Sequence, residues 1–316
     1  MKKFLSKISL FCLIFILMVF VLVFLSPTPQ ASKSLLFSKI KKDLLLEKEE
    51  SPRIIFVGGS NLSFGLNSKM IKDSLDLNPI NTGIHAGIGL IYMMESTLPY
   101  IREGDIVVLV PEYSQFLDDN SYGGLELFRT IMDVKKSDLF KLNLKQFFGI
   151  LKYFPNYALS KMNYHEYFNV EESDIYSVDS FNEFGDVNAH WKMKKQDFYP
   201  IVKNSENLNY SVFDEIVKFE RKIKEKKAIL FISYPGLQKT SFENLKEEIK
   251  NIEKIYKENN FIILGTPERY MMPESMMFNT PYHLLKSGVD LRTSLLIEDI
   301  KKALRDNSIS VPKQSL

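Results

Sequence analysis

The sequence predicts an α/β protein, in which a central parallel sheet is the middle layer of a three-layer α/β/α sandwich of the flavodoxin-like kind. Four short apolar runs show little polar alternation, which is typical of strands covered on both faces. Apolar residues at helical spacing lie between and after these runs, so crossover connections and parallel pairing are expected. The predicted strands span 53–58, 105–111, 227–235 and 261–267, and the predicted helices span 67–75, 88–101, 210–226, 241–259 and 286–304.

The N-terminus predicts one transmembrane helix. Three lysines open the chain, and an almost unbroken apolar run of eighteen residues follows from Ile8 to Leu25. At about 1.5 Å per residue the run is roughly 27 Å long, close to the hydrocarbon thickness of a bilayer. We expect residues 1–26 to be an uncleaved signal anchor with the body outside the cytoplasm, because a short basic tail favours an N-terminus inside. A signal peptide cleaved near Ala31 is the alternative.

The rest of the chain divides into a stalk at 27–50 and one domain at 51–310. Residues 115–209 are aromatic, rich in asparagine and not periodic, so we interpret them as an insertion in that domain. A nucleic-acid partner would require a concentrated basic face, and the net charge of +2 does not indicate one. The single cysteine, Cys12, lies in the apolar run, which excludes an intramolecular disulfide and argues against a cysteine-based metal site. No cofactor or metal is expected.

The segment Gly58-Gly59-Ser60-Asn61 follows the first predicted strand. A tight strand-to-helix turn demands unusual backbone angles and close approach, and glycine tolerates both. A serine in such a turn points its hydroxyl above the sheet edge, as in a nucleophile elbow, although the Gly-x-Ser-x-Gly form is absent. A phosphate-binding turn and an ordinary loop are the alternatives. The sequence has neither a Gly-x-Gly-x-x-Gly motif nor a Walker lysine after Gly58-Gly59, so it does not favour a nucleotide-binding domain.

A serine nucleophile needs a base, and the chain has four histidines. His85 follows an expected second strand, and His165 and His190 lie in the insertion. His283 precedes the last predicted helix, in a loop that can reach the carboxyl end of the first strand. We expect His283 to be the base for Ser60, with a surface or structural role as the alternative for each histidine.

These blocks resemble those of the SGNH (GDSL-like) hydrolase superfamily. The resemblance is to its membrane-anchored exported branch, which includes proteins similar to the D-alanyl-lipoteichoic acid biosynthesis protein and partners of membrane-bound O-acyltransferases. "FVGGSN" resembles the nucleophile block, "NTGIHAG" the block whose glycine amide joins the oxyanion hole, and "YHLLKSG" the histidine block. The resemblance implies that Ser60 is the nucleophile and His283 the base. It also implies that the amides of Ser60 and Gly83, with the side chain of Asn61, hold the oxyanion.

The chain departs from the superfamily's pattern at two positions. The third block usually supplies an asparagine to the oxyanion hole, whereas Glu112 follows the strand predicted at 105–111. The last block usually has an aspartate three or four residues before the histidine, where this chain has Thr280 and Asn279. Asn279 can accept a hydrogen bond from His283 and fix its tautomer, but it adds no charge. In serine proteases the same replacement costs about four orders of magnitude in rate.

Part of the insertion resembles an Asn-Glu-x-Gly-Asp segment found in some exported relatives. It reads "SFNEFGDVNAH" at 180–190 and is followed by Trp191, the only tryptophan. Polar side chains beside aromatic rings suit a sugar pocket, and an insertion that packs on itself is the alternative. The predicted substrate-binding residues are Glu112, Asn182, Asp186, His190 and Trp191.

Two hypotheses for the function follow. The first is an extracytoplasmic serine esterase or O-acyltransferase that acts on acyl esters of a cell-surface glycan. The second is a catalytically weakened domain of the same fold that binds glycan or serves as a scaffold for a membrane-bound O-acyltransferase. The missing aspartate and asparagine favour the second hypothesis, and the presence of Ser60, Gly83 and His283 favours the first.

Overall fold

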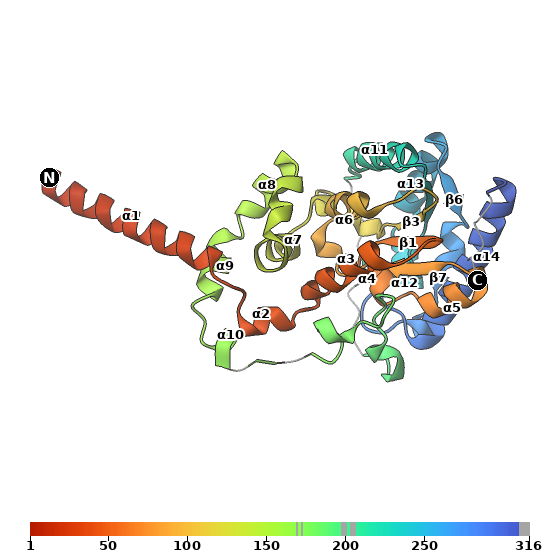
Figure 1. Cartoon of the computed structure of the whole chain (residues 1–316), viewed down its shortest axis with the longest axis horizontal. Coiled ribbons are helices and arrows are strands. Elements are labelled where there is room, and N and C mark those ends of the chain that lie inside the picture. The colour runs from red at the N-terminus through yellow and green to blue at the C-terminus, as the bar shows by residue number, and fades with distance from the viewer. Residues whose placement is uncertain (169, 172, 197–200, 203–206, 310–316) are drawn as a thin grey trace.

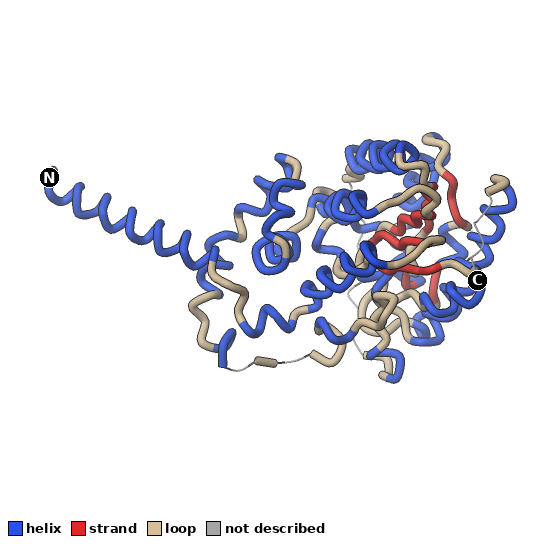
Figure 2. The backbone as a smooth tube through the Cα atoms, viewed as in Figure 1, coloured by secondary structure: helices blue, strands red, loops and turns tan. Residues whose placement is uncertain are grey.

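The computed structural model describes residues 1–168, 170–171, 173–196, 201–202 and 207–309. Its body is built on a five-stranded parallel sheet with strand order β2-β1-β3-β4-β6 (Figures 1 and 2). The strands are β1 Arg53–Gly58, β2 Asn78–Asn81, β3 Ile106–Val110, β4 Ile229–Ser233 and β6 Ile262–Leu264. The prediction of an α/β fold with a central parallel sheet is confirmed.

Helices cover both faces of this sheet. The connection from β1 to β2 runs in the opposite direction from the connections that follow, so right-handed crossovers place the first helix on one face and the next ones on the other. α5 packs against the terminal helix α14, whereas α6 packs against α11. The body helices are α5 Ser68–Leu75, α6 Leu90–Thr97, α11 Ser211–Glu225, α12 Lys239–Asn244, α13 Lys246–Glu258 and α14 Lys286–Asp306.

The helix boundaries follow local chemistry. The side chain of Asn67 accepts a hydrogen bond from the amide of Met70 and caps α5, as an asparagine N-cap should. The helix expected at 88–101 is shorter, because Pro99 starts a separate 3-10 turn at Leu98–Tyr100. The helix expected at 241–259 is two helices, α12 and α13, which meet at Leu245.

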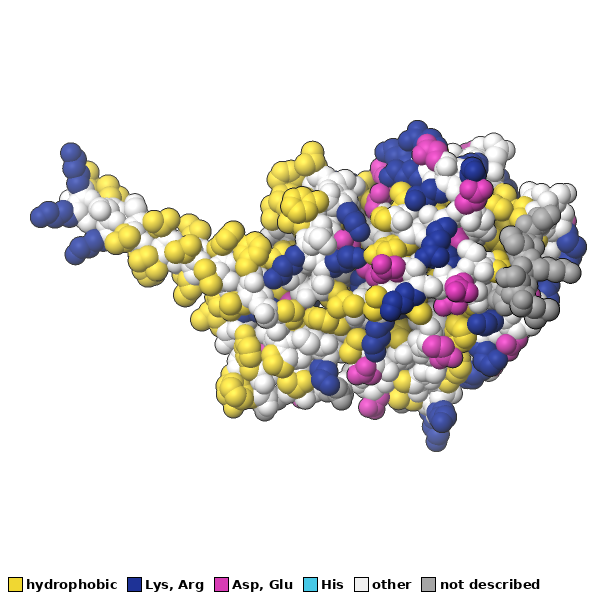
Figure 3. All heavy atoms as spheres, viewed as in Figure 1, with side chains coloured by type: hydrophobic (Ala, Val, Ile, Leu, Met, Phe, Trp, Pro, Cys, Tyr) yellow, Lys and Arg dark blue, Asp and Glu magenta, His cyan; other side chains and the backbone are white. Residues whose placement is uncertain are grey.

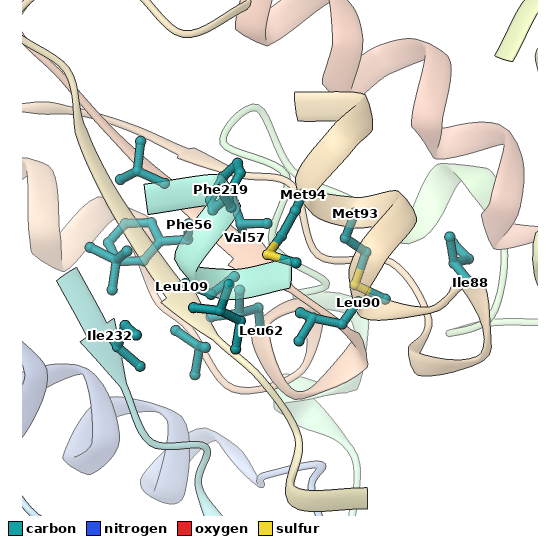
Figure 4. Close-up of a cluster of buried hydrophobic side chains, with 14 of the residues drawn as sticks. Phe56, Val57, Leu62, Ile88, Leu90, Met93, Met94, Leu109, Phe219 and Ile232 are labelled. Carbon is teal, nitrogen blue, oxygen red and sulfur yellow. The ribbon is translucent and has the colours of Figure 1, made fainter. Parts of the chain in front are cut away.

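The main core fills both faces of the sheet, and Figure 4 shows a part of it that includes residues of α6 and α11. Phe56 and Leu109 from neighbouring strands, Met94 from α6 and Phe219 from α11 are all buried. β1 and β3 are buried at every position, which explains why their sequences lack polar alternation. Two very short strands, β5 Leu237–Gln238 and β7 Met271–Met272, pair outside the main sheet and were not predicted.

The N-terminal helix α1 Lys2–Phe24 projects from the body (Figure 1). In the part of the chain that the structure describes, it is the one helix long and apolar enough to cross a membrane. Residues 27–50, for which we expected a stalk, form α2 Pro29–Lys33 and α3 Ser38–Lys48. Lys42 and Leu46 of α3 are buried and α3 packs against β2, so this segment is part of the packed body instead of a free spacer.

The insertion at 115–209 has two described parts. Its first part is helical and lies on the side of the body from which α1 projects (Figure 1). Its second part, residues 173–196, contains mainly turns and contacts the loops around the carboxyl end of the sheet. The helices of the first part are α7 Leu125–Arg129, α8 Leu144–Leu151, α9 Phe154–Ser160 and α10 His165–Phe168.

Candidate functional site

The site begins at the tight turn after β1. A β-carbon added to Gly58 would lie 2.5 Å from the carbonyl oxygen of Val110, and one added to Gly59 would lie 2.9 Å from Oε1 of Glu112. Both glycines are therefore required by close approach of β3 and the chain that follows it. The turn leads directly into the one-turn helix α4 Ser60–Ser63, and Ser60 is its first residue. The sequence predicted this strand-turn-helix arrangement.

Strand register brings Ser60 and Glu112 together. Gly58 of β1 pairs with Val110 of β3, so the residues two positions beyond each strand emerge side by side. Between β1 and β3 the strand order reverses direction, and open α/β sheets bind ligands at this switch point. The Ser60 hydroxyl donates a hydrogen bond of 3.2 Å to Oε1 of Glu112, which also accepts one of 3.1 Å from the amide of Asn61.

The carboxyl group of Glu112 is buried, and no cation of the described part of the chain contributes to its pKa. Burial disfavours the charged form and raises its pKa from 4.5 to about 7, although the hydrogen bonds from Asn61 and Ser60 oppose this shift. Near neutral pH the group is therefore divided between a carboxylate, which accepts hydrogen bonds, and a carboxylic acid, which can also donate one. A group with this pKa in contact with a serine hydroxyl is a recognised mark of a functional site.

The loop before α14 holds His283 in one tautomer. Nδ1 of His283 lies 2.9 Å from Oδ1 of Asn279, an atom that can only accept, so Nδ1 carries the hydrogen and Nε2 keeps its lone pair. The amide of Asn279 is oriented by the insertion, because its Nδ2 donates a 2.8 Å hydrogen bond to the hydroxyl of Tyr176. The expected hydrogen bond between Asn279 and His283 is present. Tyr176 is a third residue of this hydrogen-bonded chain, and the sequence did not reveal it.

His283 lies against the helical turn that carries Ser60. Its ring stacks on Phe64, with ring centroids 4.1 Å apart, and the amide of Phe64 donates to the carbonyl of Ser60 at 2.9 Å. The imidazole therefore packs on the residue that caps the end of this turn. Among the described residues, however, no hydrogen bond joins Ser60 to His283. Burial, and to a smaller extent the nearby His190 and His85, lowers the pKa of His283 well below 6.5.

Two of the three expected oxyanion donors, those of Gly83 and Asn61, already have partners. The amide of Gly83 donates to Oδ1 of Asn81 at 3.0 Å, and the amide of Asn61 donates to Glu112. The side chain of Asn61 accepts from the amide of Gly59 and donates to the carbonyl of Val110. Gly83 and Asn61 are thus at the expected place beside Ser60, but their donors are engaged within the protein.

The residues predicted to form a sugar pocket hold the insertion in place. Asp186 is buried and accepts hydrogen bonds from the amide and hydroxyl of Ser68, each 2.7 Å long. His190 is fully buried and its Nε2 donates to the carbonyl of Leu284 at 2.9 Å. Their polar atoms face protein groups and not solvent, so in this structure they fasten the insertion to α5 and to the His283 loop.

Asn182 and Trp191 lie nearer the surface. Oδ1 of Asn182 accepts from the amides of Phe184 and Asp186 and so stabilises the turn between them. Trp191 lies beneath the ammonium of Lys286, 4.7 Å from the ring centroid. Asn182 and Trp191 share a small hollow with α5, away from the hydrogen bonds around Glu112.

A larger hollow of mixed polar and apolar lining begins beside the elbow. Its wall includes Ala86, whose Cα lies 3.1 Å from a β-carbon built on Gly59, and Ser114, which follows Glu112 by two residues. The far wall comes from the insertion and includes Tyr122 and Tyr153. This hollow adjoins the switch point, and the sequence did not predict its lining.

Lys42 is a further buried group at this end of the sheet. Its ammonium donates to the carbonyl oxygens of Asn81, Gly83 and Gly185, at 3.0 Å for Asn81 and 2.8 Å for Gly185. Burial lowers the pKa of Lys42 to about 7. Lys42 thereby ties α3 to both the Gly83 loop and the insertion. In the sequence it is one lysine among several in a charged segment, and nothing local distinguishes it.

No protein-family model matches the chain, and no curated protein matches it. Within the described ranges, no group of three or more His, Cys, Asp and Glu side chains is placed to hold a metal ion. The site therefore has to be judged on its own chemistry.

Proposed function

We propose that this protein is a membrane-tethered serine esterase or O-acyltransferase of the SGNH kind, with Ser60 as the nucleophile. The proposal is supported above all by one observation: a serine at a strand-to-helix elbow, with its hydroxyl on a buried carboxyl group and an oriented imidazole against the same helical turn. The strand order and the position of this group at the switch point agree with it.

The reaction proceeds in two halves. Ser60 Oγ forms a bond to the acyl carbonyl carbon while its proton passes to a base, and the tetrahedral intermediate then collapses and expels the alcohol, which takes the proton back. The acyl-serine is next attacked by water in an esterase, or by a sugar hydroxyl in a transferase. The amide of Ser60 and the neutral form of Glu112 are the donors available to the oxyanion, because those of Gly83 and Asn61 are engaged.

Two groups can take the proton of Ser60. His283 has a free lone pair on Nε2, and its action as the base would require the Ser60 hydroxyl to leave Glu112 and approach that nitrogen. Glu112 is already in contact with that hydroxyl, and its pKa of about 7 suits a general base. The pH dependence separates them. With Glu112 as the base, the rate rises as pH passes through about 7. With His283 as the base, the rate does not rise there, because the pKa of His283 lies well below 6.5, and it falls as the neutral form of Glu112 is lost as an oxyanion donor.

The substrate we propose is an acyl ester on a cell-surface glycan. The hollow beside the elbow, with Tyr122 and Tyr153 on its far wall, offers aromatic rings for a sugar. The anchor α1 and its basic tail would hold the body outside the cytoplasm. A reporter at the C-terminus that is active only in the cytoplasm should therefore give no signal, and a strong signal would exclude this location.

A scaffold role is the second candidate, and one observation favours it. The Gly83 amide and the Asn61 side chain, both expected to stabilise an oxyanion, are engaged within the protein. Among the described residues, His283 Nδ1 contacts an amide oxygen and not a carboxylate. A domain in this state could bind an acylated glycan for a membrane-bound O-acyltransferase without reacting with it. The experiment that tests the proposal therefore has to detect the covalent step itself.

The test is covalent labelling of the full chain with a fluorophosphonate, followed by peptide mass spectrometry and by hydrolysis of 4-nitrophenyl acetate. We expect the label on Ser60, with no label and no hydrolysis above background in Ser60→Ala. Ser63→Ala is the matched control, since it removes a buried hydroxyl from the same turn that donates only to the carbonyl of Ile84. Equal labelling and equal rates in Ser60→Ala and the natural chain would reject the enzyme and favour the scaffold.

A further inference from the structure

The helical part of the insertion exposes a large apolar surface next to the anchor. We call this the apolar collar and define it by its most exposed side chains. On α8, Leu144, Phe148 and Leu151 recur at helical spacing on the outward face, while Gln146 and Ile150 are buried. This is the reverse of a soluble surface helix, whose apolar stripe faces the core. The collar consists of Phe140 (91% exposed), Leu144 (75%), Phe148 (65%), Leu159 (60%), Tyr164 (62%) and Phe168 (69%).

The collar is continuous with the end of α1. α9 packs against α1, Val23 is fully buried there, and Val19 and Leu22 are partly buried. Lys161 donates to the carbonyl of Ser26 at 3.1 Å. Figure 3 shows hydrophobic side chains along α1 and over the neighbouring side of the body.

The length of the anchor fixes how deep this contact lies. The apolar run from Ile8 to Leu25 only just spans a bilayer. If Val19–Leu25 stood outside the membrane, the eleven residues from Ile8 to Met18 would give roughly 16 Å, about half of the hydrocarbon thickness. Val19–Leu25 must therefore lie within the bilayer, and α9, which packs against them, must enter it by about 9 Å.

We infer that the apolar collar is immersed in the outer face of the membrane, with the lipid headgroup and acyl boundary as its partner. This inference assumes that α1 spans the bilayer, as in the proposed function, but it does not depend on any chemistry at Ser60. A depth of 5–10 Å is typical of interfacial amphipathic helices. Residues 139–165 contain four lysines, of which Lys141, Lys145 and Lys161 pair with Asp138, Asp119 and Asp133. The collar therefore presents little unpaired charge, and its partner is selected by apolar area.

Immersion of the collar would place the body close to the membrane surface. The same insertion supplies Tyr122 and Tyr153 to the hollow beside the elbow, so the hollow would be held at a constant height above the bilayer. An acylated molecule anchored in the same membrane could then reach it. A substrate free in solution would gain nothing from this arrangement.

The test measures the membrane depth of single labels on the full chain in lipid nanodiscs. In a Cys12→Ser background, a nitrobenzoxadiazole dye is attached at Phe148→Cys, Phe168→Cys or Val217→Cys. Val217 is the matched control, an outward apolar residue of α11 that is 38% exposed. The nanodiscs contain phosphatidylglycerol and phosphatidylethanolamine only, so that no other protein can cover the collar.

We expect doxyl-labelled lipid to quench the dyes at positions 148 and 168, and iodide to quench them at least three-fold less than the dye at 217. Equal iodide quenching at all three positions would overturn the inference and assign the collar to a protein partner. Failure of the full chain to enter nanodiscs would overturn it as well. Fluorophosphonate labelling of Ser60 in the same samples reports separately on the proposed function, so the two can fail independently.

Discussion

The buried carboxyl of Glu112 should make the stability of the protein depend on pH in a way that one substitution removes. Folding raises the pKa of this group from 4.5 to about 7, so the folded state holds the proton more tightly than the unfolded state. The free energy of unfolding then has its full value below pH 4.5, falls as the pH rises toward 7, and stays lower above that. The total loss is about 3 kcal/mol.

Glu112→Gln isolates this effect. The Gln side chain is neutral at every pH, and its Oε1 can still accept from the Ser60 hydroxyl and the Asn61 amide. Between pH 5 and pH 8 we expect the variant to gain roughly 2 to 3 kcal/mol relative to the natural chain. The measurement is urea unfolding of the full chain in detergent micelles, followed by circular dichroism at both pH values.

The control is Glu247→Gln, which removes an exposed carboxylate of α13 that pairs only with Lys250 at the surface. Its effect should stay within about 0.5 kcal/mol and change little with pH. If Glu112→Gln differs from the natural chain by the same amount at pH 5 and pH 8, the carboxyl group does not bind its proton more tightly in the folded state. The argument from burial, and with it the role of Glu112 as a base near neutral pH, would then fail.

Three further changes test other contacts. Asn279→Asp places a charge beside Nδ1 of His283, so the imidazole pKa measured by NMR should rise and ester hydrolysis should increase at least tenfold; an unchanged rate would exclude His283 as the base. Lys42→Met leaves three buried carbonyl groups without a donor and should lower the free energy of unfolding by about 3 kcal/mol or more, whereas a loss below about 1 kcal/mol would contradict its burial. Asp105→Asn removes the charge that pairs with the fully buried Arg53 and should cost about 3–5 kcal/mol in thermal or urea unfolding; a neutral result would show that Arg53 finds water or another partner.

Local sequence was sufficient for the main elements of the body. The apolar runs became strands because a strand buried on both faces needs an apolar side chain at every position, and helical spacing located most helices. The elbow was readable because glycines at a strand end mark close backbone approach. The contact between Asn279 and His283 was expected from the resemblance of the histidine block, in which the partner of the histidine lies three or four residues before it.

Contacts between distant segments were decided by the tertiary structure alone. Glu112 meets Ser60 because β1 and β3 are neighbours in a particular register, and Tyr176 reaches Asn279 across 103 positions of sequence. Asp186 and His190 looked like pocket residues, since a polar side chain in an aromatic segment is the same in sequence whether it faces solvent or a buried partner.

In the membrane-proximal segment, too, the sequence determined some features and only the folded chain decided others. Composition determined that α1 is long and apolar enough to span a bilayer, because a helix rises by a constant amount per residue. Only the folded chain decided that Lys42 is buried under the Gly83 loop, and that Leu144 and Phe148 face outward while Ile150 faces the core. Periodicity shows which residues share a helix face, but which face meets the protein depends on where the helix is packed.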